Sequence, residues 1–349
     1  MKKKPTQRKE YIFNWKKRVL VTGGASFIGS HLVDALIAKG AQVRVADDFS
    51  SGKRENIATH LAKKSIDLVE GDLRDSAIAK RAVKDVDTVF HLACDHGGRG
   101  YVDLHQANCA TNLALDGIVF FESKKARVEK IVYASSGCVY PNFLQRNPDE
   151  VLYLIEDRVG PPYDADNMYG WSKLMGELTL KAYHDDWGMN TVSCRFFTVY
   201  GERGVENHAV VAMIAKAFIK QDPFIIWGDG RQVRNWTYVG DIVEGLILAA
   251  EKINDGSSIN LGTMERIRVI EAAHAIMRHT NHHPKIHKQH HMPTGPVNRV
   301  ADNKLAKKLL HWQPKVKFVD GLHKTIDWYF ATKDPEEVKE ILPRMLTGR

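Results

Sequence analysis

The sequence predicts an α/β fold, a doubly wound parallel sheet that carries a smaller α/β lobe toward the C-terminus. Short apolar runs alternate with helical stretches as far as Val139, which is the pattern of parallel strands joined by helices on both faces of a sheet. Beyond Val139 the alternation loosens, and irregular stretches separate the remaining elements. The chain has 349 residues, enough for one large two-lobed domain or two modest ones.

The individual elements follow from this patterning. Arg18–Thr22 is a short apolar run that predicts a buried strand, and Ile28–Lys39 predicts a helix ended by Gly40. The stretch 140–167 is rich in Pro, Asn and Asp, which predicts a loop. Further strands are expected at 42–46, 65–69, 88–92, 130–134, 192–197 and 224–227, and further helices at 76–84, 110–124, 168–186, 208–220, 240–252, 265–278 and 319–331.

These elements divide the chain into four segments. We expect a flexible basic leader at 1–17, a sheet domain at 18–197, a smaller lobe at 198–332 with some strands returning to the main sheet, and a C-terminal tail at 333–349. Ligands of such sheets lie beyond the carboxyl ends of the strands. A substrate is therefore expected between the sheet and the lobe.

The composition, 44% hydrophobic and 26% charged, is that of a soluble globular protein. No apolar run approaches the roughly 18 residues of a membrane span, and residues 1–18 lack the apolar core of a secretory signal, so we expect a cytoplasmic protein with no membrane partner. The net charge is +8, but residues 1–18 hold eight Lys or Arg against Glu10 alone, which accounts for seven of those charges. Because the charge lies in the leader, we expect no nucleic-acid partner.

The cysteines and histidines predict no metal site. None of the four cysteines forms a Cys-x-x-Cys pair, and no Cys/His spacing matches a zinc site. Unpaired thiols are typical of a reducing compartment. Six histidines crowd residues 279–291, but their spacing is irregular and Pro284 lies among them, so a solvated loop is expected there.

A glycine-rich turn joins the first predicted strand to the first predicted helix. Residues Thr22–Gly29 read Thr-Gly-Gly-Ala-Ser-Phe-Ile-Gly, and in this position the free helical N–H groups can bind a dinucleotide pyrophosphate. Gly23 permits the tight turn, while Ser26 stands where the middle glycine is usual. Asp47 ends the second strand, where a carboxylate bonds the ribose 2′-OH and repels a 2′-phosphate, which favours NAD over NADP. The alternative is that Asp47 caps a turn.

Tyr169 and Lys173 lie four residues apart and therefore share one face of a predicted helix. A phenol titrates at about pH 10 in water, too high for a base at neutral pH. A nearby ammonium and the positive nicotinamide of NAD⁺ stabilise the phenolate, so Tyr169 is expected to take and return a hydroxyl proton. With the glycine turn, the pair predicts the oxidation of a sugar hydroxyl.

Shorter motifs accompany these two features. They are Gly71-Asp72-Leu73, His91-Leu92-Ala93, Tyr133-Ala134-Ser135-Ser136, Arg195-Phe196-Phe197, Val199-Tyr200-Gly201 and Trp227-Gly228-Asp229-Gly230. Over most of residues 17–330 the chain thus resembles the extended short-chain dehydrogenase/reductases, in particular the NAD-dependent nucleotide-sugar epimerases and dehydratases. The resemblance implies an NAD-binding Rossmann domain at 18–197 and a lobe that binds a nucleotide-diphosphate sugar.

The resemblance also implies roles for single residues. Ser136 would hydrogen-bond the sugar hydroxyl beside Tyr169, and Arg234 and Arg299 would grip the diphosphate with their bidentate forks. Homodimers of this family commonly form through the helix bearing Tyr169 and the helix at 110–124. The implied cofactor contacts are Gly23, Ser26, Phe27, Ile28, Gly29, Asp47, Asp72, Leu73, Leu92, Ala93, Asn112, Tyr169 and Lys173.

The segment that follows Ser136 reduces the number of reaction types that fit the sequence. Relatives that dehydrate or decarboxylate place carboxylates beside this serine, whereas residues 136–141 read Ser-Gly-Cys-Val-Tyr-Pro. One remaining reading is a UDP-hexose or UDP-uronate 4-epimerase that uses only hydride chemistry. The other resembles the GDP-mannose 3,5-epimerases, which share a cysteine at the position of Cys138 and a loop like Gly97-Gly98-Arg99-Gly100-Tyr101.

In the 3,5-epimerase reading a transient 4-ketone acidifies the neighbouring carbons. A Cys138 thiol activated by cations would remove a carbon-bound proton, and His208 stands nearest the position of the opposing acid. Gly98, Arg99 and Gly100 would form the substrate loop, with Arg99 able to bind an acidic group such as a uronate. Without the resemblance, Cys138 is a small buried filler and His208 a polar residue at a helix N-terminus.

A third reading is a non-catalytic NAD-binding sensor or RNA-associated protein. Such relatives usually lose the tyrosine, the lysine or the serine. Because Tyr169, Lys173 and Ser136 are all present, this reading is the least favoured.

Overall fold

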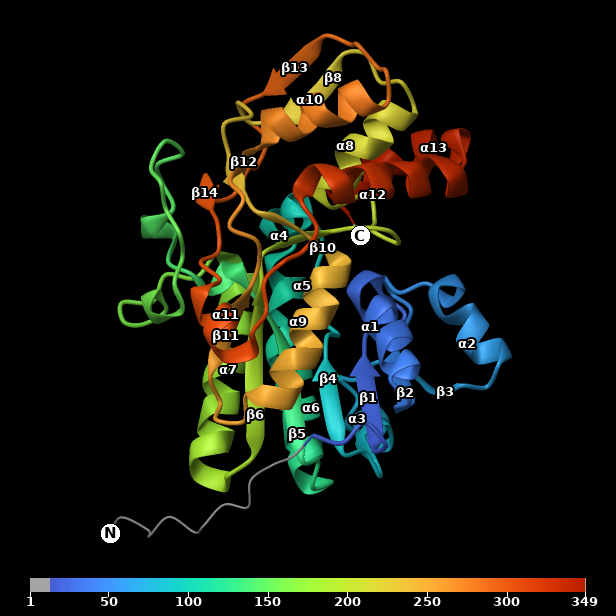
Figure 1. The fold of residues 1–349 in the computed structure, drawn as a ribbon, viewed down its shortest axis with the longest axis vertical. Coiled ribbons are helices and arrows are strands. Elements are labelled where there is room, and N and C mark those ends of the chain that lie inside the picture. The colour runs from blue at the N-terminus through green and yellow to red at the C-terminus, as the bar shows by residue number, and fades with distance from the viewer. Residues whose placement is uncertain (1–12, 349) are drawn as a thin grey trace.

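A seven-stranded parallel sheet forms the centre of the structure, a computed structural model that describes residues 13–348 (Figure 1). The strand order is β11-β6-β5-β4-β1-β2-β3, and every neighbouring pair runs parallel. Its strands are β1 (Arg18–Thr22), β2 (Gln42–Asp47), β3 (Ile66–Glu70), β4 (Thr88–His91), β5 (Lys130–Ser136), β6 (Asn190–Phe196) and β11 (Ser258–Leu261).

Helices cover both faces of this sheet, because its strands are apolar on both sides. On one face α1 (Phe27–Ala38) and α9 (Val239–Lys252) share a buried cluster with β1, β2 and β6. On the other face α3 (Ser76–Val83), α6 (Asn112–Lys125) and α7 (Asn167–Trp187) close a second cluster. The fold-class prediction is confirmed, and the strand order reverses between β1 and β4, where such sheets bind ligands.

The smaller lobe lies beyond the carboxyl ends of the strands (Figure 1). Its core is shared by α8 (Ala209–Phe218), α10 (Val269–His279), α12 (Phe318–Thr332) and α13 (Pro335–Met345). Its strands are β7 (Thr198–Tyr200), β8 (Phe224–Trp227), β9 (Val233–Arg234), β10 (Trp236–Tyr238), β12 (Ile267–Arg268), β13 (Ile286–Gln289) and β14 (Asn298–Arg299). The remaining α-helices are α2 (Ala58–Ala62), α4 (Arg99–Leu104), α5 (Gln106–Ala110) and α11 (Lys304–Leu310).

The structure corrects several local expectations. The glycine loop at 97–101 runs into helix α4. The helix expected at 110–124 is confirmed as α6, and the short helix α5 precedes it. The segment 333–349 contains α13, whose Val338 and Leu342 are buried against the lobe. Strand β13 forms inside the histidine-rich stretch by pairing with β8.

Most of the expected leader, residues 1–12, lies outside the described residues. Its last part, 13–17, packs against the body of the protein. Phe13 and Trp15 contact the core, and the Trp15 indole donates a hydrogen bond to Glu251 over 3.1 Å. In the described part of the chain, no helix is both long enough and apolar enough to cross a membrane.

Candidate active site

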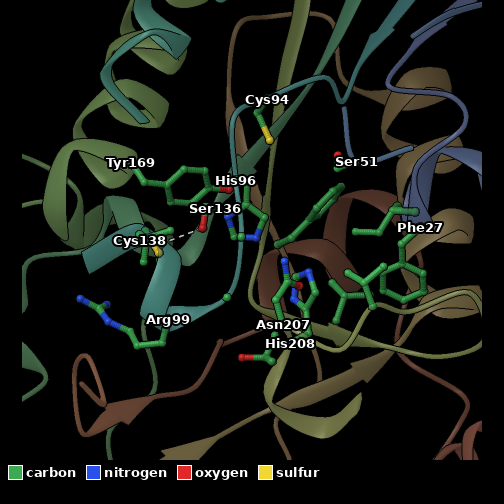
Figure 2. A pocket seen from close by; sticks show the side chains of 18 of the residues that line it. Phe27, Ser51, Cys94, His96, Arg99, Ser136, Cys138, Tyr169, Asn207 and His208 are labelled. Atoms are coloured by element: carbon green, nitrogen blue, oxygen red, sulfur yellow. Dashed lines mark hydrogen bonds between the residues drawn. The ribbon is translucent and has the colours of Figure 1, made fainter. Parts of the chain in front are cut away.

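One cavity runs from the glycine turn, past the carboxyl ends of β4 and β5, into the smaller lobe (Figure 2). Its sheet side holds most of the residues expected to contact the cofactor, and its lobe side holds Trp227 and Arg234. Ser136, Cys138 and Tyr169 lie between the two ends. The topology therefore brings segments far apart in the sequence to one site.

The glycine turn has the geometry of a phosphate cradle. Gly23 has φ of +66°, and a Cβ on Gly29 would lie 2.0 Å from the Gly23 carbonyl oxygen, so a side chain at position 29 would displace the turn. The Ser26 hydroxyl folds back and donates to the Gly23 carbonyl over 2.6 Å, which is how the turn accommodates a serine. The first turn of α1 contains no acidic residue, so its N-terminus suits an anion.

Asp47 caps the turn as well as lining the cavity. Its carboxylate accepts hydrogen bonds from the Ala25 and Phe49 N–H groups, over 2.8 and 2.9 Å. Burial raises the pKa of Asp47, while these backbone bonds oppose the rise. The capping alternative is therefore correct, and the ribose contact stays a prediction.

The other expected cofactor residues separate into two groups. Asp72, Leu73, Leu92 and Ala93 line the cavity, and a hydrogen bond from Arg74 lowers the pKa of Asp72. Asn112 does not line it, which corrects the expectation. Its amide is fully buried and exchanges two hydrogen bonds with the main chain of Asp95, over 2.6 and 2.9 Å. Asn112 thus holds the loop that follows β4.

Lys173 provides the clearest sign that the cavity fits a bound cofactor. Its side chain is 1% exposed, its ammonium lies 4.7 Å from the Tyr133 ring centroid and 5.9 Å from that of Tyr169, and it has no hydrogen-bond partner among residues 13–348. A buried ammonium with unused donors is costly unless a ligand accepts from it. The hydroxyls of a nicotinamide ribose are such acceptors, so Lys173 and the glycine cradle both suit NAD.

Tyr169 is protonated before any ligand binds. Burial raises its pKa well above the ordinary value, negative charge on the sulfur atoms of Cys94 and Cys138 adds to the rise, and a hydrogen bond with Ser136 opposes it. Ser136 is itself fixed, because its hydroxyl accepts the Cys138 N–H over 3.1 Å. The phenol can therefore act as a base only when positive charge is added beside it.

Cys138 contacts a guanidinium. Arg299 donates to the Cys138 sulfur over 3.0 Å, to Gln145 over 2.8 Å and to the Asp166 carboxylate over 3.0 Å. A cation beside sulfur favours the thiolate, the reactive form of cysteine. The contact links strand β14 to the turn that follows β5, and the sequence contains no local sign of it.

Arg99 lines the cavity, but its charge is already paired. It forms salt bridges with Asp103 and, over 2.8 Å, with Asp166. An acidic group of the substrate would have to compete with these two carboxylates, and the contact between Arg99 and a uronate stays a prediction. Gly98 and Gly100 are needed for packing, since a Cβ on them would lie 1.6 Å from the Asn207 carbonyl oxygen and 2.4 Å from that of Leu346.

Arg234, unlike Arg99, is a half-buried cation without a carboxylate partner among residues 13–348. Its guanidinium donates to the carbonyl groups of Val233 and Thr294, and no carboxylate of the described residues forms a salt bridge with it. Burial, then the charges of Arg299 and Arg99, lower its pKa to about 9. An anionic ligand would relieve this cost, as expected for a diphosphate.

His208 does not have the properties of an acid. Burial lowers its pKa to about 4, so the imidazole is neutral at pH 7. Its ring lies 6.5 Å from Phe27 and 5.5 Å from His96, centroid to centroid. The expected role as opposing proton donor is thus not supported.

Sequence reasoning missed His96, which lines the same cavity. Its ring stacks on the Tyr169 ring with centroids 4.6 Å apart and planes 26° apart. The available signal was its position directly before the glycine pair of the substrate loop, where a side chain can project into the cavity.

Doubly wound sheets that present a serine, a tyrosine and a lysine in this way are typical of the short-chain dehydrogenase/reductases. The chain belongs to the NAD dependent epimerase/dehydratase family, whose model matches residues 19–262. GDP-mannose 3,5-epimerase 1 of Oryza sativa subsp. indica is 31% identical over 342 residues, 96% of this chain and 87% of that protein.

Solved structures agree with this assignment. An epimerase of Methanothermobacter thermautotrophicus is 31% identical with a TM-score of 0.81, and the match covers 93% of this chain and 94% of that one. UDP-glucose 4-epimerase of Thermus thermophilus, solved in complex with NAD, is 29% identical with a TM-score of 0.80, covering 90% and 100%. NAD is the cofactor of the family.

Replacing Gly29 with alanine should weaken NAD binding at least about tenfold. The added Cβ, 2.0 Å from a backbone oxygen, forces the glycine turn away from the pyrophosphate position. Calorimetric titration with NAD measures the effect. Gly160→Ala is the matched control, because a Cβ there meets nothing within 4 Å; equal affinity of the Gly29 and Gly160 variants would contradict the cradle.

His208 should make the protein less stable in acid. Its folded pKa of about 4 lies below the unfolded value of 6.5, so only the unfolded state takes up a proton between these values. The free energy of unfolding should therefore fall by about 2 kcal/mol from this residue between pH 7 and pH 5. Urea unfolding at the two pH values should show a smaller fall for His208→Asn than for the wild type; equal falls would contradict a buried neutral imidazole.

Proposed function

We propose that the protein is a nucleotide-sugar epimerase that oxidises its sugar transiently at C4 and inverts an adjacent carbon with Cys138 as the base. Tyr169 takes the C4 hydroxyl proton and Ser136 holds that oxygen. NAD, when bound in the cradle, would serve as the acceptor and donor of the C4 hydride. The substrate class is close to that of the GDP-mannose 3,5-epimerases, which share the cysteine and the glycine loop.

The contact between Arg299 and the Cys138 sulfur carries this proposal. Plain 4-epimerisation requires no thiolate, and a cysteine that only fills space gains nothing from a guanidinium 3.0 Å away. A 4-ketone acidifies the C–H bonds at C3 and C5, and a thiolate is a competent base for such protons. Arg299 keeps one donor on the Cys138 sulfur while its other donors stay on Gln145 and Asp166.

The charged side chains on the lobe side of the cavity favour a neutral sugar over a uronate as the substrate. Arg99 is paired with Asp103 and Asp166, and Arg299 also shares Asp166. Arg234 and Lys216 form no salt bridge within residues 13–348, and burial lowers the pKa of Lys216 to about 8. These two cations match the two negative charges of a diphosphate. Once they are used, neither is left to bind a sugar carboxylate.

Proton NMR in heavy water tests the proposal. We expect solvent deuterium to enter GDP-mannose, or another neutral nucleotide hexose such as UDP-glucose, at C3 or C5, with UDP-glucuronate a poorer substrate. Cys138→Ser should lower this exchange about 100-fold or more, as expected when a proton-transfer group is lost. Tyr169→Phe should abolish it, because no 4-ketone forms. Cys94→Ser, the other thiol beside Tyr169, is the matched control (Figure 2).

The other outcomes are distinct. A new epimer without deuterium would mean hydride-only 4-epimerisation, and Cys138 would then be a packing residue. Unchanged turnover in Tyr169→Phe would reject C4 oxidation altogether. Turnover of UDP-glucuronate in preference to the neutral sugars would reject the charge argument.

We also propose a homodimer formed through helices α6 and α7, which pack side by side. Trp171, Met175 and Leu178 lie on one face of α7 and are 38%, 45% and 40% exposed, and Leu113 and Phe121 on α6 are 44% and 51% exposed. Apolar side chains gathered on adjacent helices are typical of an interface. A second copy of the chain would close a four-helix contact on this face.

Met175→Glu with Leu178→Glu should convert the dimer to a monomer, because four charges would enter the shared apolar contact. Light scattering coupled to size-exclusion chromatography measures the mass. Leu309→Glu is the control, since Leu309 is 41% exposed on α11, away from this face. A monomeric wild type, or a double variant that stays dimeric, would contradict the proposed interface.

A further inference from the structure

We propose that His96 is the second proton-transfer residue of the site, the group that exchanges a proton with the sugar on the side opposite Cys138. The inference rests on the proposed function, because it requires a 4-ketone and carbon-bound protons to exchange. Epimerisation by proton transfer needs a base on one face of the carbon and an acid on the other. Cys138 is the proposed base, and the acid on the other face remains to be identified.

The stacking of His96 on Tyr169 places it beside the reacting carbons. The ring centroids are 4.6 Å apart and the planes are 26° from parallel. When the C4 oxygen lies at the Tyr169 hydroxyl, C3 and C5 are each a single bond from C4. An imidazole that stacks on the phenol ring is therefore in reach of one of these neighbours. In Figure 2, His96 and Cys138 are seen on opposite sides of Ser136.

The main chain around His96 is held firmly, which is a requirement for directed proton transfer. On one side, Asp95 is bonded through its main chain to Asn112 and through its carboxylate to the Tyr101 hydroxyl, over 2.7 Å. On the other side, a Cβ on Gly97 would lie 2.5 Å from the Tyr101 Cβ, so the loop packs directly on α4. The loop therefore positions the imidazole before a substrate arrives.

The other side chains near this position are less suited to the task. His208, 5.5 Å from His96 between ring centroids, is a half-buried imidazole whose lowered pKa keeps it neutral at pH 7. Asn207 carries no transferable proton near neutral pH. Arg99 is paired with two carboxylates. Imidazole is the side chain that both gives and takes protons at physiological pH.

The proton-transfer step is balanced and involves no change of oxidation state. The Cys138 thiolate takes the C–H proton from one face, and the electron pair of that bond passes to the 4-oxygen as an enolate. The His96 imidazolium then gives a proton to the opposite face of the same carbon, and the ketone re-forms. Cys138 ends as a thiol and His96 as a neutral imidazole, and exchange with water restores both. Deuterium from the solvent should therefore enter through His96.

The test compares His96→Asn with His105→Asn. His105 also stacks on a tyrosine, Tyr101, at 4.5 Å and 28°, but it does not line the cavity. Each variant, with NAD bound, is mixed with the neutral sugar that the wild type turns over, and two signals are followed. One is the absorbance of reduced nicotinamide, which reports C4 oxidation; the other is deuterium entry at C3 and C5.

We expect His96→Asn to keep the reduced-nicotinamide signal while deuterium entry at the inverted carbon falls about 100-fold or more. His105→Asn should resemble the wild type in both signals. Added imidazole should restore part of the exchange in His96→Ala, which a purely structural role for His96 would not allow.

Deuterium entry at the wild-type rate in His96→Asn would overturn the inference and leave the proposed function intact. An equal loss of both signals, with no rescue by imidazole, would also overturn it, because His96 would then only support Tyr169. A wild type that never incorporates deuterium would instead reject the carbon acid chemistry, and the role of His96 with it.

Discussion

A single buried carboxylate, Asp166, holds the substrate end of the site together. It lies at the N-terminus of α7, the helix that carries Tyr169 and Lys173, and its N–H donates to the Cys138 carbonyl over 2.9 Å. Its side chain bridges Arg99 of α4 and Arg299 of β14. Burial alone would raise the pKa of Asp166, yet the two guanidinium groups bring it below the ordinary value. The ionised carboxylate thereby ties the sheet domain to the lobe.

The consequences of this bridge reach the chemistry directly. Because Asp166 fixes one amino group of Arg299, the other is directed at the Cys138 sulfur. Because Asp166 also neutralises Arg99, the substrate loop carries little free charge toward the sugar. Breaking a buried ion pair leaves an uncompensated charge that costs several kcal/mol. The bridge therefore sets both the reactivity of the cysteine and the charge that the sugar meets.

The parts of the site that were predictable from the sequence are those built from local spacing. The clash that requires Gly29 involves Gly23, six positions earlier, and Tyr169 and Lys173 share a helix face through their spacing of four. The alternation of strands and helices likewise predicted the doubly wound sheet, since each strand is an apolar run of its own. Periodicity and motif are enough where the interacting residues are near neighbours in the chain.

Contacts between segments far apart in the sequence could not be predicted from spacing and motifs. Arg299 meets Cys138 across 161 positions, and no local pattern marks either as the partner of the other. The resemblance led us to expect a substrate loop at Gly97, Gly98 and Gly100, but Gly98 caps α4 and packs against the Asn207 carbonyl group. Helix α13 was not predicted, because few of its residues are apolar. Its buried residues, Val338 and Leu342, pack against distant helices of the lobe.

Burial shifts the pKa of several ionisable groups of the cavity, and the outcome depends on the partner that each of these groups finds. Desolvation keeps Tyr169 protonated and His208 neutral, because neither has a charge partner strong enough to oppose it. Asp166 and Arg99 stay ionised because they face each other. Arg234 and Lys216 are destabilised as cations, since no salt bridge of the described chain compensates them. The cavity thus has a surplus of positive charge where a diphosphate would lie and little net charge around the sugar. That distribution suits a substrate held by its phosphates, whose sugar is altered by proton and hydride transfers alone.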